Sequence, residues 1–210
     1  MYYLKEKIMK VIAISGKAES GKDTIAKWLK QQLEEQNYKV MIIHFADVLK
    51  FVCRQYFDWN GEKDEYGRTL LQQVGTEMRE KNNPNMWVDI TRELIKGIGK
   101  EFDYVLVPDT RFRAEMDMLK NEFNAFALRV VRYDFDVNQN ILMPHVNKLT
   151  SEQKNHKSEC ELDTYRFDYL AINNYNSSAY LAYKCFYEPF KKFIKEDLNT
   201  VVNFYKNEKI

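Results

Sequence analysis

The most constraining feature of the sequence is a glycine-flanked loop between a short apolar run and a helical pattern. Residues 11–14 are continuously apolar, as is typical of a strand buried on both faces of a parallel sheet. Gly16, Gly21 and Lys22 follow with the spacing Gly-x-x-x-x-Gly-Lys, and residues 25–33 then carry apolar side chains at helical intervals. Strand, loop and helix in this order predict a P-loop, whose backbone N–H groups bind phosphate. The weaker alternative is an ordinary glycine turn that only caps a helix.

The residue types of this loop suit the phosphates of a nucleotide. Glycine lets the backbone turn tightly and direct successive N–H groups at phosphate oxygens, and the start of the helix adds partial positive charge. Lys22 supplies a point charge for the β- and γ-phosphates of ATP. The residues expected to bind ATP here are Gly16, Lys17, Ala18, Glu19, Ser20, Gly21, Lys22, Asp23 and Thr24.

The position after the P-loop lysine departs from the usual pattern. It is normally Ser or Thr, whose hydroxyl binds Mg²⁺, but here it is Asp23, followed by Thr24. A carboxylate is a good Mg²⁺ ligand, directly or through water, and the Thr24 hydroxyl is the alternative donor. We therefore expect Mg²⁺ as a cofactor alongside ATP, with the choice between these two donors left open.

Apolar runs with helical patterns between them recur four more times along the chain. They lie at residues 40–43, 104–107, 126–131 and 167–172. Strands that alternate with helices are typical of βαβ units with a parallel sheet. We therefore predict an α/β fold of three layers, with a five-stranded parallel sheet flanked by helices, in a single P-loop domain over residues 1–210. A long aromatic-rich helix is expected from about residue 178.

Two segments depart from this alternation. Residues 45–100 are mostly helical, and residues 133–160 are polar and weakly periodic. Long excursions from a sheet are commonly functional. We therefore expect the first segment to bind a substrate that accepts phosphate and the second to form a lid.

Charge and cysteine content limit the classes of function. The 210 residues include 32 basic and 31 acidic side chains, for a formal net charge of +1, which gives no overall attraction to polymeric nucleic acid or to an anionic membrane. Three scattered cysteines are typical of reduced thiols. The N-terminal residues have neither a signal-peptide pattern nor a long apolar run. We therefore expect a cytoplasmic protein that acts on small molecules, with its oligomeric state left open.

Charged residues follow two of the predicted strands. Ligands of open α/β sheets bind beyond the carboxyl ends of the strands, where Asp109 and Arg111 follow the third one. Asp109 suits Mg²⁺, directly or through water, and Arg111 suits a phosphoryl group; a helix N-cap beside a solvated arginine is the alternative. Arg132, after the fourth strand, is expected to stabilise the transferred phosphoryl group. Arg129, within that strand, either binds ATP or forms a structural ion pair.

The helix predicted at residues 68–80 has two distinct faces, of which one is apolar. The other presents Arg68, Gln72, Gly75 and Arg79 within a narrow arc. Such a stripe suits an anionic, hydrogen-bonding ligand, for which the glycine leaves room. A solvated helix face is the alternative, because it is the commoner fate of charged residues.

Together these segments resemble the bacteriophage-type deoxynucleoside monophosphate kinases, P-loop enzymes related to the adenylate-kinase-like group. The resemblance covers about residues 11–176, and the ordered set of motifs is more specific than the phosphate loop alone. The matching motifs are Ser15-Gly16-Lys17, Ser20-Gly21-Lys22-Asp23-Thr24, Phe45-Ala46-Asp47-Val48-Leu49-Lys50, Gly67-Arg68-Thr69-Leu70-Leu71-Gln72, Gly75-Thr76-Glu77, Trp87-Val88, Asp109-Thr110-Arg111-Phe112, His156-Lys157-Ser158-Glu159, Leu162-Asp163 and Asp168.

The resemblance implies transfer of the γ-phosphoryl group of ATP to the α-phosphate of a deoxynucleoside monophosphate, with Mg²⁺. It implies a lid with Arg132 at its base, and it places Asn173 and Asn174 near the adenine of ATP. The acceptor residues that it implies are Asp47, Arg68, Gln72, Arg79, Trp87 and Arg111, and the catalytic residues are Lys22, Asp109, Arg111 and Arg132. It leaves the role of His156, Ser158 and Glu159 open.

Two other functions stay open. The animal-type phosphomevalonate kinases have a similar loop with Asp after the lysine and a similar Asp-Thr-Arg segment. A small-molecule kinase of that kind is therefore the enzymatic alternative. A non-kinase P-loop ATPase or switch protein is the second alternative, and the arginine-bearing lid argues against it.

Overall fold

The computed structural model describes residues 9–62, 64–81, 83–136 and 141–174, and the helix expected from about residue 178 lies outside them. The elements are β1 (Lys10–Gly16), α1 (Lys22–Glu34), β2 (Val40–Ile42), α2 (Ala46–Tyr56), α3 (Glu65–Lys81), α4 (Met86–Ile98), η1 (Gly99–Glu101), β3 (Tyr104–Val107), α5 (Arg113–Phe123), β4 (Phe126–Asp136), β5 (Ile141–Pro144), α6 (Ser151–Asn155), α7 (Lys157–Cys160) and β6 (Tyr169–Asn174). None of the helices described is both long and apolar enough to cross a lipid bilayer.

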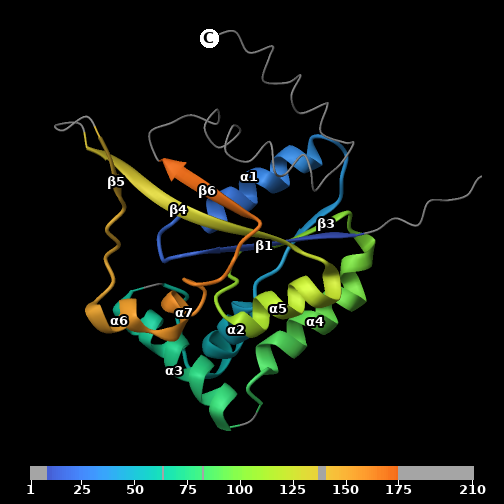
Figure 1. Cartoon of the computed structure of the whole chain (residues 1–210). Coiled ribbons are helices and arrows are strands. Elements are labelled where there is room, and N and C mark those ends of the chain that lie inside the picture. The colour runs from blue at the N-terminus through green and yellow to red at the C-terminus, as the bar shows by residue number, and fades with distance from the viewer. Residues whose placement is uncertain (1–8, 63, 82, 137–140, 175–210) are drawn as a thin grey trace, which may run out of the picture.

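Among the described residues, five parallel strands lie in the order β2-β3-β1-β4-β6 (Figure 1). They coincide with the five apolar runs of the sequence, so the predicted α/β fold is confirmed. The register places Gly16, the last residue of β1, opposite Val130 of β4, and Lys10 opposite Tyr104 of β3. The phosphate loop therefore leaves the sheet from its middle strand.

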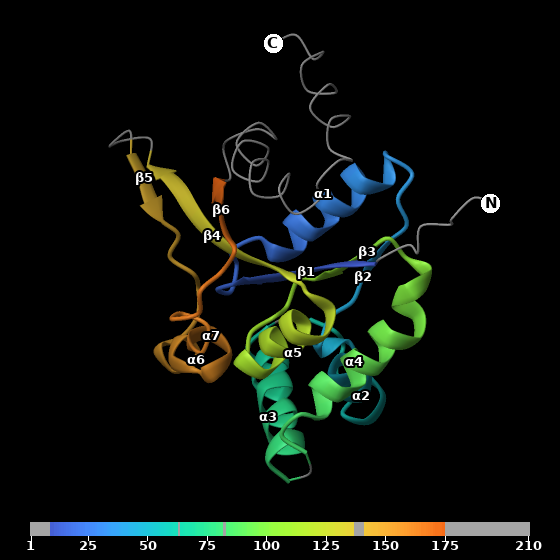
Figure 2. The same ribbon diagram turned by 45° about the vertical axis from the view of Figure 1, so that its right-hand side comes forward.

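Helices cover both faces of the sheet and complete the three predicted layers. In Figure 2, α1 lies on one face, whereas α2, α3, α4 and α5 lie on the other. Ile12 and Ile14 of β1 pack into the core that includes α1, and Val11 and Ala13 pack into the core that includes α4 and α5. Because strands of this kind are buried on both faces, they are continuously apolar in the sequence.

Residues 45–100 form α2, α3 and α4, which share a hydrophobic cluster of their own. Trp87 is buried in this cluster with Leu49 and Val74. Its indole N–H donates to the backbone carbonyl oxygen of Gly75 at 3.3 Å. Trp87 therefore joins α4 to α3, and its role is chiefly in packing, although the resemblance assigns it to the acceptor.

Within the described residues, the sheet also has one antiparallel strand, β5, which falls in the segment predicted to form a lid. The chain alternates polar and aromatic residues over 132–136, a strand pattern, and β4 accordingly continues to Asp136 and pairs with β5. Tyr133 pairs with Pro144 of β5 and with Asn174 of β6. At Tyr133, β5 and β6 therefore lie on opposite edges of β4. Since β6 also lies opposite β1 across β4, β5 and β1 share the same edge. The chain that leaves β5 therefore arrives beside the phosphate loop.

Candidate functional site

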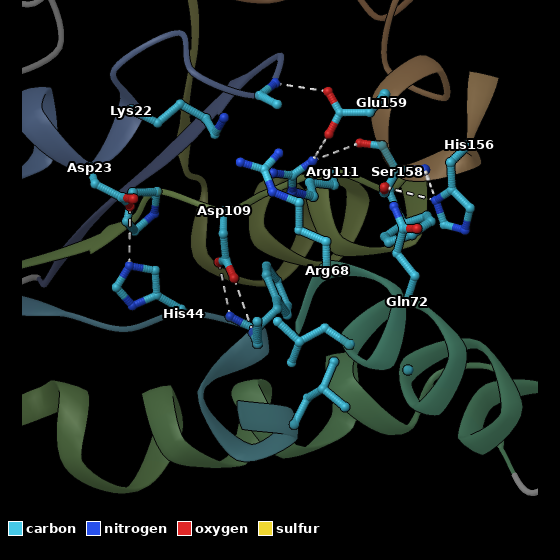
Figure 3. Close-up of a pocket in the computed structure, with 18 of the residues that line it drawn as sticks. Lys22, Asp23, His44, Arg68, Gln72, Asp109, Arg111, His156, Ser158 and Glu159 are labelled. Carbon is cyan, nitrogen blue, oxygen red and sulfur yellow. Dashed lines mark hydrogen bonds and ion pairs between the residues drawn. The ribbon is translucent and has the colours of Figure 1, made fainter. Parts of the chain in front are cut away.

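A cavity of about 780 Å³ lies at the carboxyl ends of β1 and β3, beside the phosphate loop, α3 and α7 (Figure 3). It brings together residues from distant parts of the chain that the sequence predicts for ATP, for the acceptor and for catalysis. Those that line it are Ala18, Glu19, Gly21, Lys22, Asp23, Thr24, Arg68, Gln72, Arg79, Trp87, Asp109, Arg111, Arg132 and Asn173. One cavity thus joins the predicted phosphate-binding loop to the predicted acceptor stripe.

The phosphate loop has the backbone shape that its glycines predict. Gly21 has a φ of +89°, and a Cβ there would lie 2.2 Å from Nδ2 of Asn173. The Asn173 side chain donates to the carbonyl oxygen of Ser20 at 2.9 Å, so it supports the loop directly. Gly16 and Ser20 shape the loop without lining the cavity. The side chain of Asn174, which the resemblance places near adenine, lies outside the described part of the structure.

Lys22 is buried at the start of α1, with 8% of its surface exposed. Its Nζ donates to the carbonyl oxygens of Gly16 and Lys17, at 2.8 and 2.7 Å. Burial, together with the nearby charge of Arg111, lowers the pKa of Lys22 to about 7. An ammonium group that is held in a buried site by neutral carbonyls is stabilised by an added anion, such as a nucleotide phosphate.

His44 joins Asp23 to Asp47, a connection for which the sequence carries no signal. Its Nε2 lies 3.4 Å from Oδ1 of Asp23, and its Nδ1 lies 3.3 Å from Oδ2 of Asp47. Burial opposes protonation of His44, but the hydrogen bonds to both carboxylates outweigh it and raise its pKa to about 9. Asp47 does not line the cavity, and its contact with the acceptor stays a prediction. Its carboxylate holds His44 and Lys50.

The first turn of α1 offers oxygen ligands that fit Mg²⁺. Asp23 and Thr24 are exposed and line the cavity. Mg²⁺ at nucleotide sites is usually bound by one or two carboxylates together with phosphate oxygens, so this donor set suits an ion that is shared with ATP. Within the described ranges, no cluster of three or more His, Cys, Asp or Glu side chains could hold a metal.

Asp109 binds the start of α2. Its Oδ1 accepts from the backbone N–H of Phe45 at 2.9 Å, and its Oδ2 accepts from that of Ala46 at 3.0 Å. Asp109 therefore caps a helix that begins 63 residues earlier in the chain, whereas the sequence suggests a cap for the helix that follows it. Because each oxygen has one N–H donor, any contact with Mg²⁺ uses the remaining lone pairs.

Arg111, which follows β3, and Arg132, in β4, both line the cavity. Arg111, after β3, bonds through Nη1 to the carboxylate of Glu159 and to the carbonyl oxygen of Ser158 at 3.3 Å. Arg132, in β4, donates from Nη1 to the carbonyl oxygen of Glu19 at 3.4 Å. Two guanidinium groups therefore line the same cavity as the buried ammonium group of Lys22.

Lys17 and Arg129 lie outside the lining of the cavity, and their side chains bind other parts of the chain. Nζ of Lys17 bonds to Oδ2 of Asp163 and to the carbonyl oxygen of Glu159, both at 2.5 Å. Arg129 bonds to Oδ1 of Asp163 at 2.9 Å and to Oγ of Ser15 at 3.1 Å. The structural ion pair is therefore the interpretation of Arg129 that the structure supports.

The polar stripe on α3 faces the cavity. Arg68, Gln72, Gly75 and Arg79 all line it and none of them is exposed, which favours a ligand-binding face over the alternative of a solvated helix face. The guanidinium carbon of Arg79 lies 4.0 Å from the centroid of the Phe112 ring, a distance at which the ring face attracts a cation. The aromatic ring therefore holds Arg79 in a fixed place on the wall of the cavity.

Glu19 places a carboxylate within the phosphate loop. Its φ of +63° lies in the left-handed region, which costs a residue with a Cβ about 1–2 kcal/mol. Its Oε1 lies 3.7 Å from Nη2 of Arg68. Its Oε2 lies 3.4 Å from both Nε2 of His145 and the backbone N of Lys148. Glu19 thus links the loop to α3 and to the chain that leaves β5.

Glu115 is a buried carboxyl group at the cavity wall beside Arg111. Its Oε2 accepts from the backbone N–H groups of Arg111 and Phe112, at 2.7 and 3.0 Å. Burial nevertheless raises the pKa of Glu115 to about 8. A glutamate in the first turn of a helix is a familiar sequence signal for such a cap, but that signal does not reveal its burial.

Comparisons with known proteins give limited matches. A family model described as "Chromatin associated protein KTI12" matches residues 9–88, less than half of the chain, from β1 through α3 into α4. No curated protein matches the sequence. Among solved structures, a mutant of the Mycobacterium tuberculosis APS kinase CysC is similar, with a TM-score of 0.41 and 11% sequence identity. The alignment covers 91% of this chain and 97% of that chain.

Proposed function

We propose that the chain is a P-loop kinase that transfers the γ-phosphoryl group of ATP to the phosphate of a (deoxy)nucleoside monophosphate. The observation that supports this most is the shared cavity, in which Lys22 and Arg111 lie together with Arg68 and Arg79. The first pair suits the phosphates of a donor. The second pair lies on a separate helix and suits the phosphate of an acceptor.

The proposed chemistry rests on position and positive charge. Lys22 binds the β- and γ-phosphates, while Arg111 and Arg132 stabilise the phosphoryl group as it moves. Bound Mg²⁺, held through Asp23 or Thr24, would neutralise further charge on the phosphate oxygens. No protein group has to become covalently attached to the phosphoryl group, because transfer of this kind depends chiefly on alignment.

We propose that residues 133–160 act as a lid over the cavity and that α2, α3 and α4 hold the acceptor. Leu149, Gln153 and His156 of the proposed lid line the cavity, which supports its placement over the substrates. Closure of such a lid excludes water, so that the phosphoryl group goes to the acceptor and not to hydrolysis.

A second candidate is a nucleotide-dependent switch that hydrolyses ATP and acts on a macromolecular partner. It is favoured by the family match over residues 9–88, because the description of that family names chromatin. The two candidates share the phosphate loop. They differ in whether the arginine stripe on α3 binds a small acceptor.

A coupled assay of ADP release, with a panel of deoxy- and ribonucleoside monophosphates and phosphomevalonate, separates these functions. The kinase proposal predicts that ADP is released only when a nucleoside monophosphate is present. ADP release with phosphomevalonate, but with none of the nucleoside monophosphates, would support the alternative small-molecule kinase. Release without any acceptor would support the switch, and the absence of release in every case would contradict both candidates.

Arg79→Ala is expected to raise the KM for the acceptor by about 10- to 100-fold, because a hydrogen bond to a charged group contributes about 1.5–3 kcal/mol. The KM for ATP should stay unchanged, since Arg79 lies on α3, a helix that we propose to hold the acceptor. Arg92→Ala is the matched control: its side chain pairs on the surface with Asp89 and Glu122. An unchanged acceptor KM in Arg79→Ala would remove Arg79 from the acceptor site.

A further inference from the structure

Glu159 is one of three charged side chains that are buried among the described residues, with Lys22 and Glu115. It lies on α7, and 8% of its surface is exposed. Burying a carboxylate is unfavourable unless the group is paired and hydrogen-bonded. Its position in the fold therefore depends on what its oxygens bind.

The two carboxylate oxygens of Glu159 bind two different parts of the site (Figure 3). Oε2 accepts from the backbone N–H of Ala18, in the phosphate loop, at 2.8 Å. Oε1 forms an ion pair with Nη1 of Arg111, in the segment that follows β3. One rigid carboxylate thus fixes the distance between the loop and the guanidinium group.

The backbone around Glu159 strengthens this connection. Its carbonyl oxygen accepts from Nζ of Lys17 at 2.5 Å, and the carbonyl oxygen of Ser158 accepts from Nη1 of Arg111 at 3.3 Å. Asp163, four residues later, pairs with Lys17 and Arg129. The segment therefore gathers three cations that would otherwise repel one another beside the loop.

These contacts also determine which donors of Arg111 can meet a ligand. A guanidinium group has five N–H donors in a fixed plane, and Nη1 is already bound to Glu159 and Ser158. The donors on Nη2 and Nε belong to a side chain that lines the cavity. With one edge of the plane held by α7, the other donors are fixed in direction before any substrate binds.

We propose that Glu159 is a positioning residue for phosphoryl transfer, which holds Arg111 at a set place relative to the phosphate loop. The inference rests on the proposed kinase function. It assigns a role to a motif, His156-Lys157-Ser158-Glu159, that the sequence leaves without one. Misplacement of a group by about 1 Å can lower a rate about 100-fold, so a tether of this kind acts on turnover more than on substrate binding.

Glu159→Gln separates the two bonds, because a glutamine oxygen still accepts from Ala18 while its NH₂ group cannot pair with Arg111. We expect kcat to fall by about 10- to 100-fold, with a smaller rise in the KM for ATP and little change in the KM for the acceptor. Glu161→Gln is the matched control on the same segment. Its carboxylate accepts from the backbone N–H of Arg113 at 2.8 Å and does not line the cavity, so kcat should stay close to that of the wild type.

A double-mutant cycle with Arg111→Ala tests whether Glu159 acts through Arg111. If it does, Glu159→Gln has no further effect on kcat in the Arg111→Ala background, because groups that act as a unit are not additive. If the losses of kcat in the two single variants multiply in the double variant, the proposal is overturned. Should Glu159→Gln fail to fold, Glu159→Asp takes its place in the cycle, because it keeps the charge and moves it away from Arg111.

A second measurement keeps the inference separate from the proposed function. Arg111 near the γ-phosphate should make ATP bind more tightly than ADP, and Glu159→Gln and Arg111→Ala should each reduce that preference without adding together. Dissociation constants for the two nucleotides, measured with a fluorescent analogue, test this without turnover. If no acceptor causes ADP release, the kinase proposal is contradicted, but the nucleotide-binding test of Glu159 is unaffected. An ATP preference that Glu159→Gln leaves unchanged overturns the role of Glu159.

Discussion

Lys22→Ala is expected to lower turnover by roughly 10²- to 10³-fold, the loss typical when one preorganised group that stabilises transition-state charge is removed. Lys22 is buried at the start of α1, and its Nζ is held by the carbonyl oxygens of Gly16 and Lys17. In the proposed reaction it exchanges these neutral acceptors for phosphate oxygens, and its charge moves with the transferred group. Alanine leaves the loop backbone intact but removes that charge.

The fold should survive this substitution, because the ammonium group bonds to the loop itself and not to the hydrophobic core. The measurement is kcat from ADP release, together with the thermal unfolding midpoint of each variant. Lys27→Ala is the matched control, since Lys27 is an exposed residue of the same helix. Near-normal turnover in folded Lys22→Ala would contradict the assignment of the loop to catalysis.

The second large effect concerns stability. Burial raises the pKa of Glu115 from 4.5 to about 8, so the folded protein keeps a proton that the unfolded chain releases. This group contributes its full stabilisation below pH 4.5 and loses it as the pH rises toward 8. The free energy of unfolding should therefore fall across this range, by at most about 1.4 kcal/mol per pH unit from this one residue.

Glu115→Gln should remove that slope. The amide oxygen of glutamine can accept from the N–H groups of Arg111 and Phe112 as the carboxyl group does, but it has no proton to lose. Urea denaturation of both proteins between pH 4.5 and 8 provides the comparison. Their difference isolates Glu115 from other titrating groups, among them His44, whose raised pKa of about 9 also removes stability as pH rises. Parallel curves for the two proteins would show that Glu115 is ionised in the folded state.

The parts of the molecule that local sequence determines could be predicted. Burial on both faces makes each parallel strand continuously apolar, so all five strands are recognisable in the sequence, and the phosphate loop follows from the spacing of Gly16, Gly21 and Lys22. The stripe on α3 is also predictable, because helical periodicity alone groups its four residues. Helical periodicity alone does not determine which face of α3 lines a cavity, whereas the structure shows that the polar stripe does.

The parts that long-range contacts determine could not be predicted. Glu159 is buried only because α7 packs against a loop that lies 141 residues earlier in the chain. His44 becomes a bridge only because the first turns of α1 and α2 meet at the carboxyl edge of the sheet. The extension of β4 that pairs with β5 is a different case, since the alternating pattern at residues 132–136 is visible in the sequence. This pattern is hard to recognise as part of a strand because it continues an apolar run without a break.

The contact between Asp109 and α2 bears on how this kind of site can diverge. Asp109 recognises only main-chain N–H groups, which every residue except proline provides. Substitutions at Ala46 or farther along the exposed side of α2 therefore leave the anchor intact. The side chains of α2 that line the cavity, among them Leu49 and Lys50, can therefore change while the helix stays attached to the same place on the sheet. In the proposed kinase, an attachment of this kind lets substrate specificity evolve without the loss of the scaffold that carries the phosphate loop.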